Sequence, residues 1–320
     1  MVLIFVAFGL LASAIVTNKI LLYALSPELL VGVRMIVASF FLLLYSYFQP
    51  QHRISIALFK RYFSLLCIIA LFTTFFPSNL KAYALAHMPS SKMAFFGTLD
   101  PFVAALGSYV LYNERLSIQK WLGLGIGFLG MLVLIFTSSP LEQSLRAFSV
   151  ISYPEIAAFF AIVISRFGWI LAQDLLKKNI VGPVQINILT MFMGGLLSLV
   201  VAFQRAQTTV IPLTHAPLTI LTTPPLSLIS PFNQLIGFLL YTIIMGNMLG
   251  YTLYAKVLKH YSATFIALSG FSIPLMVHLL GWLFLGEQLS FVFFCACGIT
   301  FSGLLLFFFD ERSSNIKSLQ

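Results

Sequence analysis

The chain has 320 residues, of which 60% are hydrophobic and only 8% are charged, and its mean hydropathy is +1.00. A soluble domain carries about 25% charged residues, so this composition excludes a water-soluble globular protein and indicates a polytopic membrane protein. The net charge of +9 does not indicate nucleic-acid binding, because the basic residues are scattered between apolar segments and form no patch.

Ten apolar segments can be drawn as membrane-spanning helices, each of which needs about 20 residues. In chain order they cover residues 2–24, 28–48, 63–86, 92–112, 118–137, 151–173, 183–203, 234–256, 262–285 and 289–309. The first segment has no basic residues before it and continues to Leu25, so we expect a spanning helix rather than a cleaved secretion signal. The pattern predicts an all-α polytopic membrane protein with ten transmembrane helices.

The basic residues between these segments predict the orientation. With the N-terminus inside, the external segments hold only Lys92, Arg146 and Arg205. The cytoplasmic segments then hold Arg53, Lys60, Arg61, Arg115, Lys120, Lys177, Lys178, Lys256, Lys259, Arg312 and Lys317. This excess follows the positive-inside rule. We therefore expect both termini in the cytoplasm and the chain in the cytoplasmic (inner) membrane.

An internal repeat divides the chain. Residues 80–136 align with residues 253–309 without gaps, and the identical pairs include Ala94/Ala267, Gly97/Gly270, Pro101/Pro274, Glu114/Glu287 and Gly130/Gly303. Each copy covers three helices of a five-helix half. Because five is odd, the second half must enter the membrane in the opposite orientation, as in the inverted repeats of secondary transporters, whose substrate sites lie near the midplane.

The repeat predicts the domain organisation. We expect a first five-helix repeat over residues 1–137, an external linker over 138–150, a second repeat over 151–310 and a cytoplasmic tail over 311–320. A long loop, residues 204–233, is rich in Pro and Thr, and by parity it is external. Its prolines argue against a further span, and a tolerated insertion is the simplest interpretation.

Several repeated residues are predicted to be structural. Pro101 and Pro274 are expected to kink the fourth and ninth helices, because a proline clashes with the carbonyl four residues earlier. Those earlier residues are Gly97 and Gly270, which ease the crowding. Asp100 is not repeated, so the kink does not need it.

Two glutamates recur in the turns after the same helices. Glu114 lies in "NERLS" and Glu287 in "GEQLS". A carboxylate near a helix start favours the helix dipole. Both glutamates are therefore interpreted as structural rather than as transport residues.

The chain resembles a known family. Residues 18–34, "NKILLYALSPELLVGVR", place Lys19, Pro27 and Arg34 in a Lys, Pro, Arg pattern over the first two helices. Together with the inverted five-helix repeats and the E-x-L turns, this resembles the EamA branch of the drug/metabolite transporter superfamily. The resemblance implies a carrier of small metabolites that hydrolyses no ATP of its own. The family's substrates include amino acids, S-adenosylmethionine, sugar and nucleotide derivatives, and drugs.

A few polar residues remain inside the predicted helices. Each charged one costs about 2.5–3.5 kcal/mol on insertion scales, so such residues usually face a polar interior or serve function. We expect a shared central cavity that binds an anionic or zwitterionic small molecule, with Asp100 near an amine. The predicted substrate-binding residues are Lys19, Arg34, Lys81, Asp100, Asn79 and Asn247.

Other interpretations stay open for these residues. Lys19 and Lys81 are near enough to the outer face to snorkel to the interface. Arg34 could be a structural partner of Glu28 or of a backbone carbonyl. Arg166, in the cytoplasmic half of the sixth helix, could snorkel inward.

The driving force of transport, a coupled proton or substrate exchange, also stays open. Asp100 and His278 are candidates to carry a coupling proton, while substrate exchange needs neither, and a lone His such as His278 is often a packed helix residue. Aromatic residues could stack on a ring-bearing substrate; the candidates are Tyr83, Tyr109, Trp169, Tyr251, Tyr254 and Trp282.

The sequence contains no P-loop, H-E-x-x-H or G-x-S-x-G motif. We therefore expect no enzyme, no catalytic residue, no cofactor and no metal site. The predicted function is secondary active transport, by alternating access, of an amino acid or an S-adenosylmethionine-like compound, in a monomer or homodimer. The alternatives are an exporter of hydrophobic or cationic drugs and, from another class, a membrane-embedded transferase or sensor.

Overall fold

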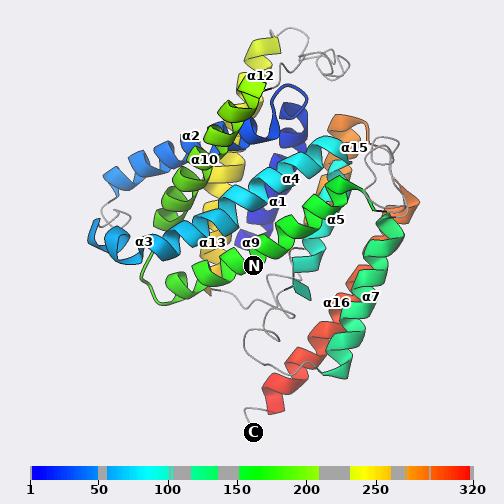
Figure 1. Cartoon of the computed structure of the whole chain (residues 1–320). Coiled ribbons are helices and arrows are strands. Elements are labelled where there is room, and N and C mark those ends of the chain that lie inside the picture. Colours follow the sequence, from blue (N-terminus) through cyan, green and yellow to red (C-terminus); the bar gives the residue numbers. More distant parts are fainter. Residues whose placement is uncertain are drawn as a thin grey trace.

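A computed structural model describes residues 2–49, 56–100, 102–103, 117–135, 151–208, 231–260, 270, 272–287 and 290–317. This part of the chain is almost entirely helical (Figure 1). In the first half the elements are α1 (Val2–Leu21), α2 (Pro27–Phe48), α3 (Ile56–Ala70), the π-helical η2 (Leu71–Phe75), α4 (Phe76–His87), α5 (Ser90–Phe96), the short 3₁₀ turn η3 (Gly97–Leu99) and α7 (Ile118–Ile135).

The second half contains α9 (Tyr153–Lys177), α10 (Pro183–Thr208), α12 (Pro231–Tyr241), the π-helical η5 (Thr242–Gly250), α13 (Tyr251–His260), α15 (Ser272–Leu285) and α16 (Phe291–Lys317). Several boundaries differ from the sequence-based ones. Helix α10 extends into the predicted loop 204–233, and α16 continues through most of the predicted tail 311–320.

Five of the described helical segments are long and apolar enough to cross a membrane: Pro27–Phe48, Lys60–His87, Tyr153–Lys177, Pro183–Ala206 and Phe232–Val257. Shorter apolar helices lie on the first, fifth, ninth and tenth predicted segments. The chain is therefore a multi-pass membrane protein. The count of ten helices and the inverted layout remain predictions.

Local sequence signals fix where two long helices begin. The Ser26 side chain accepts a hydrogen bond from the Leu29 amide, and Pro27 occupies the first turn of α2. Helix α9 begins with a capping box, in which Ser152 and Glu155 satisfy each other's backbone amides. These caps set the positions of α2 and α9, which both contribute to the cavity described below.

The helices pack around α1. It contacts α15, η5 and α13, while α2 lies along α10 and α4 lies along α9. Helices α7 and α16 pack along each other and stand to one side of the other helices (Figure 1). The two π-helical segments, η2 and η5, overlap in position when the repeat alignment is extended towards the N-terminus. A duplicated five-helix unit would produce this coincidence.

Glycines allow α7 and α16 to approach closely, although not every glycine of these two helices takes part. A Cβ on Gly303 would lie 2.6 Å from the Gly123 carbonyl oxygen and 2.7 Å from the Gly127 nitrogen. A Cβ on Gly125 or Gly298 would meet nothing within 4 Å. Backbone approach at Gly303 therefore requires a residue without a side chain.

The substitution Gly303→Ala is accordingly expected to destabilise the protein, since overpacking against rigid backbone costs about 1–3 kcal/mol. Gly298→Ala, on the same helix, adds the same methyl group into open space and serves as the matched control. Thermal unfolding of both variants in detergent measures the difference. Equal melting temperatures would show that the two helices separate without cost.

Candidate functional site

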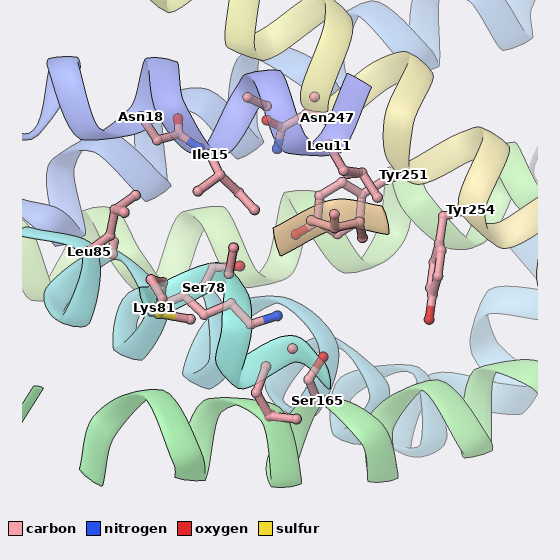
Figure 2. Close-up of a pocket in the computed structure, with 18 of the residues that line it drawn as sticks. Leu11, Ile15, Asn18, Ser78, Lys81, Leu85, Ser165, Asn247, Tyr251 and Tyr254 are labelled. Carbon is pink, nitrogen blue, oxygen red and sulfur yellow. The ribbon is translucent and has the colours of Figure 1, made fainter. Parts of the chain in front are cut away.

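A cavity of about 260 Å³ lies between helices of the two predicted halves (Figure 2). The first half contributes residues from α1, α2, α4 and α5, and the second contributes residues from α9, η5, α13 and α15. The lining includes both members of several pairs of equivalent repeat positions, namely Gly97/Gly270, Asp100/Ile273, Lys81/Tyr254 and Ser78/Tyr251. The cavity therefore has the location that an inverted repeat predicts for a substrate site.

Two cationic side chains of the cavity have no counter-ion among the residues that the structure describes. Arg34 is 8% exposed, and neither it nor Lys81 makes a hydrogen bond or ion pair with any residue in the described ranges. The alternative that pairs Arg34 with Glu28 is wrong, because the Glu28 carboxylate binds Arg205. Figure 2 shows the Lys81 side chain extending into the cavity. Such buried cations can bind a ligand carboxylate or phosphate.

Asp100 has a partner that the sequence analysis did not assign. Its Oδ2 lies 3.0 Å from a guanidinium nitrogen of Arg166, which donates a hydrogen bond to it. Arg166 is 9% exposed, so the interpretation that it snorkels to the interface is wrong. The pair links the η3 region of the first half to α9 of the second.

Aromatic and amide groups complete the lining. Trp169 on α9 contacts both tyrosines of α13, with ring centroids 6.3 Å from Tyr251 and 5.1 Å from Tyr254. We call these three residues the aromatic cluster. Asn247 also lines the cavity, and its amide donates to the Met35 sulfur over 2.8 Å. Of the other aromatic candidates, Trp282 is 51% exposed, Tyr83 is not a lining residue and Tyr109 lies outside the described residues.

Lys19 and Asn79 do not line the cavity. The Lys19 ammonium donates to the carbonyl oxygens of Leu85, at 2.6 Å, and Met88, at 2.8 Å, so it caps the C-terminal end of α4. The snorkelling alternative for Lys19 is wrong as well, since the residue is buried. The Asn79 amide donates to the Phe75 carbonyl and to the Ser198 hydroxyl, and the second bond joins α4 to α10.

His278 is also outside the cavity lining. Its ring stacks on Phe293 with centroids 3.9 Å apart and contacts the edge of Phe294. Both ring nitrogens are buried without a hydrogen-bond partner among the described residues. This environment is that of a packed helix residue.

The predicted structural residues have mixed outcomes. Glu287 binds at the start of α5, accepting hydrogen bonds from the Ser90 amide, at 2.7 Å, and the Ser90 hydroxyl, at 2.8 Å. It therefore caps a helix distant in sequence rather than the next one. Pro274 is buried in α15, close to residues outside the described ranges, and its kink stays a prediction. Pro101 and Glu114 lie outside the described residues.

Lys92 is not the external loop residue that the orientation argument assumed. It lies within α5, is 4% exposed, and its ammonium is 2.7 Å from the Glu155 carboxylate at the start of α9. The positive-inside count therefore loses one external residue, which leaves the bias in the same direction.

Sequence reasoning missed several lining residues. Ser78 and Ser165 carry no charge that would mark them, and the role of Arg166 depends on the rotation of α9. The sequence did contain one signal for the role of Arg166. An acid, Asp100, and a base, Arg166, both lie inside predicted helices, and such residues usually pair with one another. Among the described residues, no group of three or more His, Cys, Asp or Glu side chains could hold a metal ion.

The described helices define a multi-pass membrane protein, and its mainly apolar cavity is lined by the charged residues Arg34, Lys81 and Asp100. A family model described as the EamA-like transporter family matches residues 1–136 and 153–309, so the chain belongs to this family. The chain is therefore a transporter and not an enzyme.

Curated relatives carry more specific names. The S-adenosylmethionine/S-adenosylhomocysteine transporter of Chlamydia muridarum is 27% identical over 97% of this chain and 91% of its own length. The protein of the same name from Chlamydia trachomatis serovar L2 is 28% identical over 97% and 89%. Protein PecM of Dickeya dadantii is 26% identical over 70% and 66%. A crystal structure with 16% identity superimposes at a TM-score of 0.60 over 95% of this chain and 94% of the other, which shows a shared fold.

Proposed function

We propose that the chain is a secondary carrier of S-adenosylmethionine and S-adenosylhomocysteine, working by alternating access in the cytoplasmic membrane with both termini inside. The observation that carries the proposal is that one cavity combines the aromatic cluster with two cations, Arg34 and Lys81, for which the described part of the chain holds no counter-ion. The names of the curated relatives support the same substrates.

The chemistry of these ligands fits the two parts of the cavity. Each has an amino-acid end with a carboxylate and an ammonium group, and each has an adenosine end with an aromatic base. The carboxylate would bind Arg34 and Lys81 by charge-assisted hydrogen bonds. The adenine would stack on Trp169 or a tyrosine, and base–aromatic stacking contributes about 1–3 kcal/mol per base.

Exchange is the coupling that these contacts favour. The Asp100 carboxylate is paired with Arg166, and His278 does not line the cavity. Neither predicted proton carrier is therefore an unpaired side chain of the cavity. A carrier that exchanges S-adenosylmethionine for its demethylated product needs no proton.

Binding is tested first by thermal unfolding of the purified protein with a panel of metabolites. At a concentration 100 times its dissociation constant, a ligand should add about 2.7 kcal/mol to the stability of the folded state. We expect both adenosyl compounds to stabilise the protein and free methionine, glutamate and sugar phosphates to have no comparable effect. Stabilisation only by hydrophobic cations would contradict the proposal and favour the drug-export alternative.

Transport is tested with the protein in liposomes. We expect uptake of labelled S-adenosylmethionine when the vesicles contain either adenosyl compound, and little uptake into empty vesicles. An imposed pH gradient should leave this exchange unchanged. Uptake that requires the pH gradient would contradict exchange coupling and restore the proton hypothesis.

A further inference from the structure

Asp100 is the sole acidic side chain among the described residues that line the cavity. Its Oδ2 is held by Arg166, while its other oxygen, Oδ1, makes no hydrogen bond with a described residue. The Asp100 side chain is 30% exposed and the Arg166 side chain 10%, so the acid, and not its partner, is open to the cavity. The arrangement presents a fixed negative group to a ligand.

This negative group lies at the aromatic side of the cavity. Arg166 and Trp169 are one turn apart on α9, so they share a face of that helix. Trp169 in turn contacts Tyr254, with ring centroids 5.1 Å apart. The acid that Arg166 holds therefore lies on the same side of the cavity as Trp169 and Tyr254. We call the part of the cavity at Arg34 and Lys81, the proposed carboxylate site, the cationic region.

The two proposed substrates differ in the charge on their sulfur atom. The sulfur of S-adenosylmethionine carries three carbon substituents and a positive charge, and the sulfur of S-adenosylhomocysteine is an uncharged thioether. The α-ammonium sits on the carbon that bears the carboxylate, so it follows the carboxylate to the cationic region. The sulfur is bonded to the ribose, so it follows the adenosine to the aromatic cluster.

We propose that Asp100, held in position by Arg166, recognises the positive charge on the ligand sulfur and so sets the preference of the cavity for sulfonium over thioether compounds. The inference rests on the proposed function. Asp100 offsets one of the three positive charges of Arg34, Lys81 and Arg166, and so weakens their repulsion of a sulfonium. Neighbouring aromatic faces add cation–π attraction for the same group.

The test is the substitution Asp100→Asn, which removes the charge and keeps the shape. Isothermal titration of the purified full-length protein would give the dissociation constants for both adenosyl compounds. We expect binding of S-adenosylmethionine to weaken by about tenfold or more, equivalent to about 1.4 kcal/mol or more. Binding of S-adenosylhomocysteine should be nearly unchanged, which also reports that the variant is folded.

Asp174→Asn is the matched control. Asp174 is on α9, the helix that carries Arg166, and it also pairs with a base, Lys178, at 2.9 Å, but its side chain is 60% exposed and it does not line the cavity. Removing that charge should leave both dissociation constants unchanged. A similar loss of S-adenosylmethionine binding in Asp174→Asn would show a long-range effect of net charge and overturn the proposal.

A second measurement needs no variant. On the natural chain, an analogue with an ammonium group in place of the sulfonium should bind about as well as S-adenosylmethionine, and both should bind more tightly than S-adenosylhomocysteine. Equal affinity for all three would overturn the inference, as would an equal loss of both adenosyl compounds in Asp100→Asn. If the natural chain binds neither compound, the proposed function itself fails; if it binds both without charge preference, only this inference fails.

Discussion

Glu155→Gln is expected to lower the free energy of unfolding by about 3–5 kcal/mol, the usual cost of breaking a buried ion pair by removing one partner. The Lys92 and Glu155 side chains are 5% and 1% exposed, so the substitution removes the negative charge of an ion pair that is shielded from water. The measurement is the melting temperature in detergent, together with unfolding by a denaturing detergent.

Two comparisons sharpen this prediction. The double variant Lys92→Met with Glu155→Gln removes both charges and should recover much of the lost stability. Glu28→Gln breaks the pair with Arg205, whose side chain is 67% exposed, and should cost less than about 1 kcal/mol. Equal costs for Glu155→Gln and Glu28→Gln would show that the Lys92 pair is hydrated in the membrane protein.

Lys81→Met is expected to remove most ligand binding while leaving the melting temperature of the unliganded protein nearly unchanged. The Lys81 side chain extends into the cavity and has no ion-pair partner within the described residues, so its loss costs the fold little. The ligand carboxylate would lose a charge-assisted hydrogen bond, and such bonds contribute about 1.5–3 kcal/mol. That corresponds to a loss of about tenfold to a hundredfold in affinity.

Lys19→Met makes the same chemical change and should have the opposite effect. Lys19 binds the last carbonyl groups of α4, so its loss should lower the melting temperature and leave the ligand contacts of the folded protein in place. Thermal unfolding with and without S-adenosylmethionine separates the two variants. If Lys19→Met instead abolishes binding at unchanged stability, Lys19 belongs to the site and the lining must rearrange when ligand binds.

The contrast between these two lysines illustrates what the sequence could predict. Apolar length located the helices, and the insertion cost of a charge identified Lys19, Arg34, Lys81 and Asp100 as unusual. Which of them face one cavity depends on how each helix is rotated about its axis, and hydropathy carries no such information. Arg34, Lys81 and Asp100 line the cavity, whereas the Lys19 ammonium binds a helix end.

The interaction partners of the charged residues were harder to predict than their positions in the helices. Glu28 is six residues from Arg34 in the sequence, yet it pairs with Arg205 on a distant helix. Glu287 was correctly expected to have a structural role at a helix start, but that helix is α5, far away in the sequence. Tertiary packing brings these groups together. Local sequence patterns can therefore identify the charged residue but not the distant residue with which it interacts.

The π-helical segments have a consequence for the direction in which the cavity residues point. Ser78 and Lys81 follow η2 closely, and Tyr251 and Tyr254, at the equivalent repeat positions, directly follow η5. One residue more or less in a helix rotates everything beyond it by about 100°. The number of residues in each π-helical segment therefore determines the direction in which these side chains point. Deletion of a single residue there would turn them towards other helices or lipid.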